Sequence, residues 1–464
     1  MKSFTMAALA FATSVLAAAP SNVSPNDLRP RATLEAVTVK GNAFFKGEER
    51  FYIRGIDYQP GGAADAKDPL ADEEICKRDI AEFKKLGANV VRVYTVDNTK
   101  DHTTCMGLLA DAGIYLVLDA STPKYSLNRA DPKPSYNAVY LQSLFATIEE
   151  FAKYTNTLAF FSGNEVINDG TTTNAAPYVK ATTRDMRAYI KAKGLRKIPV
   201  GYSAADVSEN RMEMAAYMNC GSDDERSDFF AFNDYSWCAP NTFTGAGWDQ
   251  KVKNFTGYGV PIFLSEYGCI KPGPRTFEEV ESLYSTDMTA VYSGGLAYEY
   301  SEEGSGYGLV KIKDTKSVTE LKGFDYLKKA FASTKSPSGD GGYTSTKGKA
   351  SECPAKSSNW NVTTADLPTI PKKAAEYMKG DVGKGPGLKG AGSQTAGGDG
   401  VSSEGTTPSG SGTEGGSESG TETGDSSGET SESASSGLVA PIDFKIAYVG
   451  MVVLGCFFGG GLLL

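Results

Sequence analysis

Histidine is almost absent from this chain, which has one, His102, among 464 residues. The seven cysteines include no Cys-x-x-Cys pair, so Zn²⁺ would find too few soft ligands. Any histidine-dependent catalytic triad would have to use His102. No glycine-rich phosphate loop follows a strand-like run, and the net charge of −9 argues against nucleic acid as a partner. We therefore expect no metal and no cofactor.

Both ends of the chain carry export signals. Met1–Ala19 has a lysine, an apolar region and a small-residue cleavage site, and it predicts a signal peptide rather than a buried helix. Ile446–Leu464 is apolar to the last residue, and the small residues Ser433–Gly437 precede it. This order predicts a glycolipid (GPI) attachment signal with attachment near Ser435 and removal of residues 438–464. The alternative is a retained membrane helix.

Six cysteines remain once the C-terminal signal is removed, which suits an oxidising compartment. Their pairing cannot be assigned from spacing alone. Asn22, Asn254 and Asn361 begin Asn-x-Ser/Thr sequons, and we expect N-glycosylation at Asn254 and Asn361.

Residues 380–437 are dominated by Gly, Ser, Thr and Glu, with almost no large apolar side chain. Such a segment cannot bury enough apolar surface to fold, so it predicts a disordered stalk. The folded body is then residues 20–379, a length that one barrel domain can occupy.

Within the body, short apolar runs alternate with amphipathic stretches. The runs expected as strands are Phe51–Tyr58, Ala88–Thr95, Ile114–Ala120, Thr157–Glu165, Ile198–Ser203, Phe229–Trp237, Val260–Gly268 and Gly295–Tyr300. The stretches expected as helices include Asp72–Leu86, Ala138–Tyr154, Tyr178–Lys193 and Phe277–Tyr292, with helix stops at Gly87, Gly113, Gly194 and Gly294. Eight such strands predict an α/β fold, a (β/α)₈ TIM barrel, with an open doubly wound sheet as the rival. Leu34–Arg50 is expected to be a hairpin that plugs the barrel bottom.

Two of the predicted strands end in a glutamate, Glu165 after Phe160-Phe161-Ser162-Gly163-Asn164 and Glu266 after Phe263-Leu264-Ser265. The two residues are far apart in sequence, so they can meet only if their strands share one sheet. Burying a carboxylate is costly unless it has a partner or a task. Two strand-end carboxylates that meet are what a glycosidase requires.

The other expected strand ends are rich in carboxylates and tyrosines, which would surround this pair. A tyrosine offers a flat apolar face and a hydroxyl, which suits a sugar ring, although each could instead pack the barrel mouth. Arg54 and Arg92 interrupt apolar strands, and each should face a carboxylate. If Arg92 faces Glu266 it keeps that residue ionised; a structural aspartate is the alternative partner.

Six motifs together resemble one known family. They are Arg54–Gly61 (RGIDYQPG), Asn89–Tyr94 (NVVRVY), Gly163–Val166 (GNEV), Tyr235–Cys238 (YSWC), Leu264–Cys269 (LSEYGC) and Tyr298–Ser301 (YEYS). In this order they resemble the fungal GPI-anchored β-1,3-glucanosyltransferases of glycoside hydrolase family 72. The resemblance spans the whole body, and it extends to the stalk and the anchor signal.

The resemblance implies roles for particular residues. It makes Glu165 the acid/base and Glu266 the nucleophile, and it places at sugar-binding positions Gln59, Tyr94, Asp119, Asn164, Tyr235, Tyr298 and Tyr307. It also implies the disulfides Cys76–Cys105, Cys220–Cys353 and Cys238–Cys269. Some members carry a cysteine-rich carbohydrate-binding module after the barrel; only Cys353 occupies that region here, so we expect the module to be absent.

The function that follows is transfer, in which the enzyme cleaves internal β-1,3-glucan bonds and joins the new reducing end to the non-reducing end of another glucan. The catalytic pair alone does not distinguish transfer from hydrolysis, so a secreted endo-β-1,3-glucanase is the alternative. An inactive protein that binds wall glucan is a third. We expect a monomer, held by its lipid on the outer leaflet of the plasma membrane and facing the cell wall.

Overall fold

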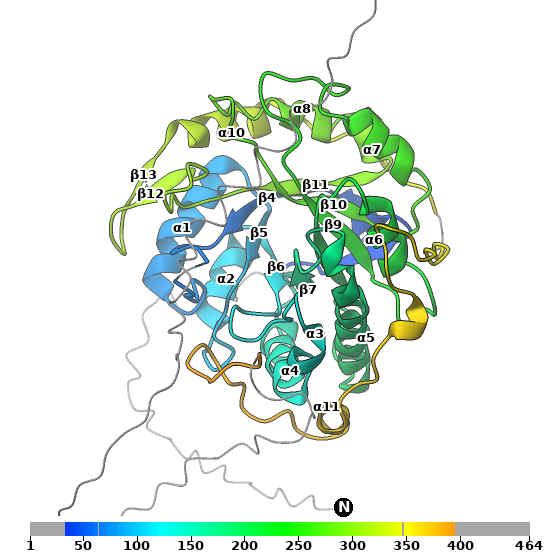
Figure 1. The fold of residues 1–464 in the computed structure, drawn as a ribbon. Helices are drawn as coiled ribbons and strands as arrows, with labels where there is room; N and C mark the ends of the chain where they lie inside the picture. Colours follow the sequence, from blue (N-terminus) through cyan, green and yellow to red (C-terminus); the bar gives the residue numbers. More distant parts are fainter. Residues whose placement is uncertain (1–32, 64, 346–347, 395–464) are drawn as a thin grey trace, which may run out of the picture. The chain divides into compact units, whose positions relative to one another are not determined.

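The computed structural model describes residues 33–63, 65–345 and 348–394. Eight parallel strands close into a barrel in the order β10-β11-β4-β5-β6-β7-β8-β9, with helices outside it (Figure 1). The barrel strands are β4 Ile53–Tyr58, β5 Val90–Val93, β6 Tyr115–Asp119, β7 Thr157–Asn164, β8 Val200–Ala205, β9 Phe229–Asp234, β10 Ile262–Tyr267 and β11 Tyr292–Ala297. The predicted (β/α)₈ barrel is confirmed, and the open sheet is excluded.

Helices follow most of the strands and cover the barrel. They are α1 Glu73–Leu86, α2 Thr103–Asp111, α3 Pro132–Ser135, α4 Ala138–Ala152, α5 Ala176–Ala192, α6 Arg211–Met218, α7 Trp248–Phe255, α8 Glu279–Leu283, α9 Thr286–Thr289, α10 Lys322–Ser333 and α11 Lys372–Tyr377. Short 3₁₀ turns occupy Thr171–Ala175 and Thr364–Asp366, and a small hairpin joins β12 Val310–Ile312 to β13 Val318–Glu320.

Helix α1 forms where its sequence predicts it. The side chain of Asp72 caps its first turn by accepting from the backbone amides of Glu74 and Ile75. Gly87 ends it with a left-handed backbone, φ 80°. The apolar residues Phe83 and Leu86 are buried against the barrel. Local signals and tertiary packing agree here, so this helix could be predicted.

The expected helix Phe277–Tyr292 is wrong. Two short helices, α8 and α9, replace it because Ser285 takes an extended backbone (φ −77°, ψ 162°) between them. Strand β11 then begins at Tyr292, three residues before the expected start. Gly294 is not a helix stop but lies inside β11 with φ +92°, where a Cβ would come within 2.2 Å of the Ile53 carbonyl oxygen. The glycine is therefore required by close strand approach.

The N-terminal segment closes the bottom of the barrel as predicted for Leu34–Arg50, but with three strands where a two-stranded hairpin was expected. It forms an antiparallel sheet of three strands, β1 Val37–Lys40, β2 Ala43–Lys46 and β3 Glu49–Phe51. From β2 the fully buried Phe44 contacts the rings of Phe229 and Phe263, at 6.1 and 5.9 Å between centroids. The plug thus supplies the lowest aromatic layer of the barrel interior.

Three disulfides join the pairs that the family resemblance implies, Cys76–Cys105, Cys220–Cys353 and Cys238–Cys269. The last links the segments that follow β9 and β10, at the mouth of the barrel. The sequon residues Asn254 and Asn361 are exposed.

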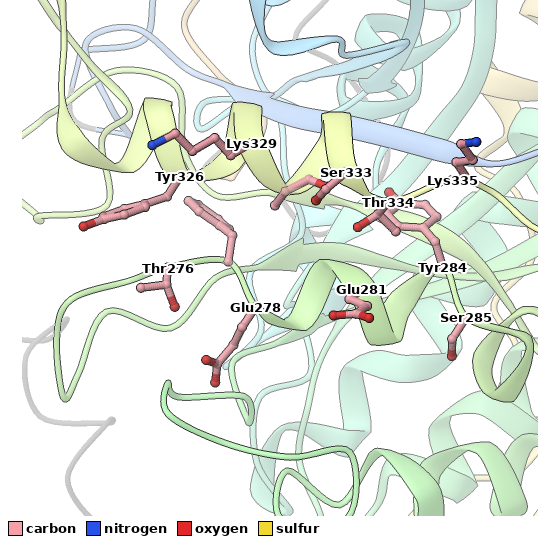
Figure 2. A pocket seen from close by; sticks show the side chains of 12 residues that line it. Thr276, Glu278, Glu281, Tyr284, Ser285, Tyr326, Lys329, Ser333, Thr334 and Lys335 are labelled. Carbon is pink, nitrogen blue, oxygen red and sulfur yellow. The ribbon is translucent and has the colours of Figure 1, made fainter.

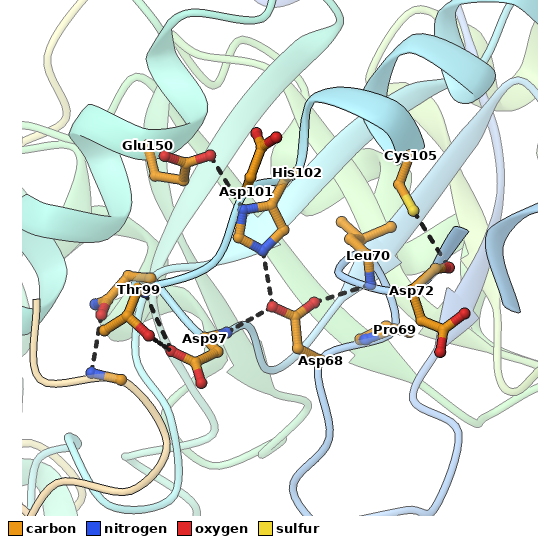
Figure 3. A network of polar contacts seen from close by, with 12 residues as sticks. Asp68, Pro69, Leu70, Asp72, Asp97, Thr99, Asp101, His102, Cys105 and Glu150 are labelled. Carbon is orange, nitrogen blue, oxygen red and sulfur yellow. Dashed lines mark hydrogen bonds and ion pairs between the residues drawn. The ribbon is translucent and has the colours of Figure 1, made fainter. Parts of the chain in front are cut away.

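His102, the single histidine, is fully buried at the start of α2 (Figure 3). Its Nε2 lies 2.7 Å from Asp68 Oδ2, and its Nδ1 lies 3.1 Å from Glu150 Oε1 on α4. Asp68 also accepts from the backbone amides of Leu70 and Asp97. Burial opposes protonation of the ring, but the two carboxylates prevail and raise the pKa of His102 to about 9. His102 thus links the start of α2 to α4 and to the segment before α1, and its buried position outside the barrel mouth excludes a catalytic triad built on it.

The folded body continues past Lys379, and the stalk boundary expected at residue 380 is corrected. In Figure 1 the orange C-terminal segment runs past α11 and α4. Val382 and Ser393 are buried, and their carbonyls accept from Gln142 Nε2 and Asn137 Nδ2, both at 2.9 Å. Although the segment has few apolar residues, side chains of α4 and of its N-cap Asn137 bind its backbone carbonyls and help to hold it on the body.

The predicted signal peptide, Asn22, most of the predicted stalk, and the attachment signal with Ser435 lie outside the described residues. In the part of the chain that the structure describes, no helix is both long and apolar enough to cross a membrane.

Candidate active site

The barrel interior is layered from bottom to top. Above the plug, Phe161 contacts the rings of Phe229 and Phe263. The guanidinium of Arg92 lies over Phe161 at 4.6 Å and over the ring of Tyr94 at 4.1 Å. Arg92 therefore separates the aromatic bottom from the polar mouth, at the carboxyl ends of the strands where (β/α)₈ enzymes bind their substrates.

Glu266, on β10, accepts hydrogen bonds from three side chains at the mouth. Its Oε1 accepts from Tyr94 Oη at 2.9 Å and from Arg92 Nη1 at 3.3 Å, and its Oε2 accepts from Tyr235 Oη at 2.7 Å. Burial raises the pKa of Glu266 to about 7, with Arg92 opposing the rise and the charge of Glu165 adding to it. The three donors favour the ionised form that a nucleophile needs.

Arg92 is fully buried and is shared among three carboxyl groups. It donates to Asp119 through Nε at 2.8 Å and Nη2 at 3.2 Å, so both partners considered from the sequence, an aspartate and Glu266, are real. Asp57 Oδ1 lies 3.9 Å from Nη1, beyond hydrogen-bond reach. Burial outweighs the attraction of Arg92 and raises the pKa of Asp57 well above its ordinary range. Burial thus favours the neutral form of Asp57.

Glu165 follows β7 in a backbone conformation that non-glycine residues seldom adopt, φ +47°. Its amide donates to the Ser203 carbonyl at 2.9 Å, and its Oε1 accepts from Asn233 Nδ2 at 2.8 Å. Such strain persists only where surrounding contacts fix it, and it concentrates at functional sites. The side chain is half-buried, as a group that must reach both substrate and solvent would be.

Asn164 is oriented by its neighbours on β8 and β9. Its Oδ1 accepts from the Ser203 hydroxyl at 2.7 Å and from Asn233 Nδ2 at 3.3 Å. The Ser265 hydroxyl lies 2.8 Å from both Ser203 Oγ and Asn233 Oδ1. This network spans four strands, β7 to β10, and therefore fixes the two glutamates relative to one another.

Three tyrosines form an aromatic wall on the mouth. The ring centroids are 6.3 Å apart for Tyr235 and Tyr298, 5.6 Å for Tyr235 and Tyr307, and 5.4 Å for Tyr298 and Tyr307, all edge to face. All three side chains keep part of their surface exposed. The wall can therefore pack against a sugar ring.

A groove of about 330 Å³ opens at the strand ends. Its lining includes four of the residues expected to bind sugar, namely Gln59, Tyr94, Asp119 and Asn164. A larger hollow, about 550 Å³, lies between α8 and α10 (Figure 2). Tyr326 and Lys329 line it from one side and Glu278 and Glu281 from the other, and no member of the glutamate pair or of its bonded neighbours lines it. The smaller groove adjoins the glutamate pair, because its lining includes Tyr94, which donates to Glu266, and Asn164, which directly precedes Glu165.

The residues expected to act on or bind the sugar all lie at or beyond the carboxyl ends of barrel strands. Sequence reasoning assigned no role to Asn233, Ser203 or Arg275, all of which hold site residues in place. Asn233 and Ser203 are polar residues within two positions of the carboxyl ends of β9 and β8, which is a usable signal. Arg275 lies in a loop, and nothing local marks it.

A (β/α)₈ barrel with two glutamates at the ends of β7 and β10 defines a carbohydrate-active enzyme that works by paired carboxylates. The family model described as Glucanosyltransferase, of glycoside hydrolase family 72, matches residues 28–335. The chain belongs to this family and is a glucanosyltransferase.

Several relatives are similar over most of their length. The 1,3-beta-glucanosyltransferase gel1 of Aspergillus fumigatus is 65% identical over 383 residues, 82% of this chain and 83% of that protein. GAS5 of Saccharomyces cerevisiae, also named a 1,3-beta-glucanosyltransferase, is 52% identical over 75% of this chain and 72% of its own. A solved structure of a Saccharomyces cerevisiae Gas2p mutant in complex with laminaritetraose and laminaripentaose has a TM-score of 0.68 and 39% identity, covering 74% of this chain and 76% of that one.

Proposed function

We propose that Glu266 is the nucleophile and Glu165 the acid/base of a retaining β-1,3-glucanosyltransferase. The observation that carries this assignment is the difference between the two carboxylates. Glu266 is buried and accepts from Arg92, Tyr94 and Tyr235, whereas Glu165 is half-buried and accepts from the neutral amide of Asn233. A nucleophile must be ionised and fixed, while an acid/base must exchange its proton.

In the first displacement, an oxygen of Glu266 attacks the anomeric carbon of an internal glucose unit. The bond from that carbon to the glycosidic oxygen breaks, and Glu165 gives its proton to the departing oxygen. The products are a glucosyl ester on Glu266 and a shortened glucan. In the second displacement, Glu165 takes the proton of an acceptor hydroxyl, whose oxygen attacks the same carbon. The ester breaks, and Glu266 is restored as a carboxylate.

The sugar-binding residues are proposed to be Gln59, Tyr94, Asp119, Asn164, Tyr235, Tyr298 and Tyr307. Four of them line the groove, and the other three are the partly exposed tyrosines of the wall, of which Tyr235 donates to Glu266. β-1,3-Glucan as donor and acceptor fits the laminari-oligosaccharides bound in the structure of the yeast relative. For transfer to occur, this surface must bind an acceptor sugar so that its hydroxyl reacts with the ester before water does, although water is present at roughly 55 M.

We also propose where the protein works. Three disulfides fit an exported protein. Residues 1–19 would direct export, and residues 438–464 would be exchanged for a GPI lipid near Ser435, which leaves the enzyme on the outer leaflet as a monomer facing the wall. Asn254 and Asn361 would carry N-glycans, since both are exposed.

The stereochemistry of chemical rescue tests the two roles separately. The donor would be a β-1,3-gluco-oligosaccharide with a dinitrophenyl leaving group, which departs without protonation, and azide would be added. Glu165→Ala should form the ester and give the β-azide by two displacements, whereas Glu266→Ala should give the α-azide by one. Exchange of these outcomes would reverse the roles, and a β-azide from both variants would remove Glu266 from the mechanism.

Product size tests transfer against hydrolysis. A soluble chain ending at Gln394 would be incubated with a reduced linear β-1,3-gluco-oligosaccharide. We expect products that are longer than the substrate and still β-1,3-linked. Shorter products alone would support the endo-β-1,3-glucanase alternative. Binding without any product would support the inactive wall-binding alternative.

A further inference from the structure

Tyr307 lies on a loop that has little intrinsic rigidity. The segment between β11 and β12 contains Gly304, Gly306 and Gly308, and the first two have φ of +90° and +83°. Glycine loses more conformational freedom on ordering than other residues, so three of them in five positions make this loop costly to fix. A tyrosine of the wall nonetheless stands in it.

The carboxylate of Glu302 fixes this loop in one conformation by binding three of its backbone amides. Its Oε1 accepts from the amides of Gly304 at 2.8 Å and Gly306 at 3.0 Å, and its Oε2 accepts from Gly308 at 2.9 Å. A Cβ on Gly308 would lie 2.4 Å from the Cα of Glu302, so the loop folds directly onto this residue. Tyr307 is therefore held between two amides that a single carboxylate binds.

Arg275 holds the same tyrosine through its backbone carbonyl. Its guanidinium is buried, and it donates to the carbonyl oxygens of Gly268, Tyr298 and Tyr307. It also lies 5.7 Å from the ring centroid of Tyr307. One cation thus ties the backbone of two wall tyrosines to the end of β10, close to Glu266.

We propose that Glu302 and Arg275 are positioning residues that hold Tyr307 against Tyr298 and Tyr235, so that the glucan meets a preformed aromatic wall. This inference rests on the glucan-binding role proposed for Tyr307. Both oxygens of Glu302 are occupied by loop amides, and the donors of Arg275 point to carbonyls, so each acts through the tyrosine and not on the sugar. Preorganisation of this kind lowers the entropy cost of binding.

The conservative variant Glu302→Gln tests the proposal because it keeps the shape but loses the charge and one acceptor oxygen. We expect the KM for a reduced β-1,3-gluco-oligosaccharide to rise about tenfold with kcat changed less than about threefold. Arg275→Lys, which leaves one donor group for three carbonyls, should act in the same direction and serves as the second variant.

Asp314→Asn is the matched control. Asp314 accepts from the amides of Lys316 and Ser317 and from the Ser317 hydroxyl in the turn between β12 and β13, and it makes no contact with the wall. It has the same number of loop hydrogen bonds as Glu302 and should leave both KM and kcat unchanged. A tenfold rise in KM for this control would make the effect of Glu302→Gln non-specific and overturn the proposal.

A double-mutant cycle with Tyr307→Ala decides whether Glu302 acts through the tyrosine. If it does, Glu302→Gln should change KM by less than about twofold once Tyr307 is absent. Additive effects would mean that Glu302 acts independently of Tyr307, and the positioning role would be wrong. If Tyr307→Ala alone leaves KM unchanged, the glucan-binding role of Tyr307 fails first and the inference falls with it.

Discussion

At the scale of single residues, Glu266 shows how a buried carboxylate is kept usable. Burial pushes its pKa up, and three donors push it down. These opposing effects should be visible in the pH dependence of the reaction, because the nucleophilic role proposed for Glu266 requires its ionised form.

Tyr235→Phe removes the hydrogen bond to Glu266 Oε2 and keeps the aromatic ring. Loss of a donor to the ionised form raises the pKa of Glu266 further above about 7, so the acid limb of kcat/KM should move to higher pH. At neutral pH we expect kcat/KM to fall about tenfold. Tyr258→Phe, whose hydroxyl donates to the Ala215 carbonyl away from the site, is the control. An acid limb at the parent pH would contradict the prediction.

Asp57 and Asp119 flank the same guanidinium but should respond differently to amidation. Burial raises the pKa of Asp57 well above its ordinary range and favours its neutral form, so Asp57→Asn should change kcat/KM by less than about threefold. Asp119→Asn replaces the carboxylate that accepts from both Nε and Nη2 of Arg92, and it should lower kcat/KM about a hundredfold. Equal losses in the two variants, measured as initial rates, would show that Asp57 is ionised.

The glutamate pair could be predicted because each residue ends an apolar strand, and strand ends gather at one face of a barrel. The supporting residues could not. Asn233 bonds Glu165 across two strands, and Arg275 reaches two tyrosine carbonyls from a loop. Such partnerships depend on register and loop path, which sequence spacing does not encode.

At the scale of elements, the same limit separates α1 from the α8–α9 region. Capping residues, periodicity and packing agree in α1. Between Phe277 and Tyr292 the apolar spacing still suits a helix, but an extended Ser285 divides it. Helical propensity is a weak prior where tertiary contacts oppose it.

His102 links α2, α4 and the segment before α1, and this link should depend on pH. Because its pKa is raised from 6.5 to about 9 in the fold, its stabilising effect is complete below about pH 6.5 and is lost as pH rises through about 9. The free energy of unfolding lost in His102→Gln should therefore be greater at pH 6 than at pH 9.5, by on the order of 3 kcal/mol. Denaturant titration at both pH values measures it, and an equal loss at both would refute a charged His102.

At the scale of the whole molecule, the end of the folded body is the point most open to test. A chain ending at Lys379 lacks the buried Val382 and Ser393 and their hydrogen bonds to α4, whereas a chain ending at Gln394 keeps them. We expect the shorter chain to melt at least about 4 °C lower by calorimetry. Equal melting temperatures would return the boundary to residue 380. Composition misplaced it because glycine-rich segments can still be ordered by backbone hydrogen bonds.

The plug at the barrel bottom also dictates an order of events during synthesis. Phe44 leaves the ribosome early. Two of the rings that it packs against, Phe229 and Phe263, are translated only after more than half of the folded body has been made. Asn42 must wait longer still, because it donates to the Ala290 carbonyl and accepts from the Thr344 amide. The first segment of the body to be translated is therefore among the last to find its partners. Until then chaperones must shield its apolar face. Premature release of the nascent chain would leave that face exposed and prone to aggregation.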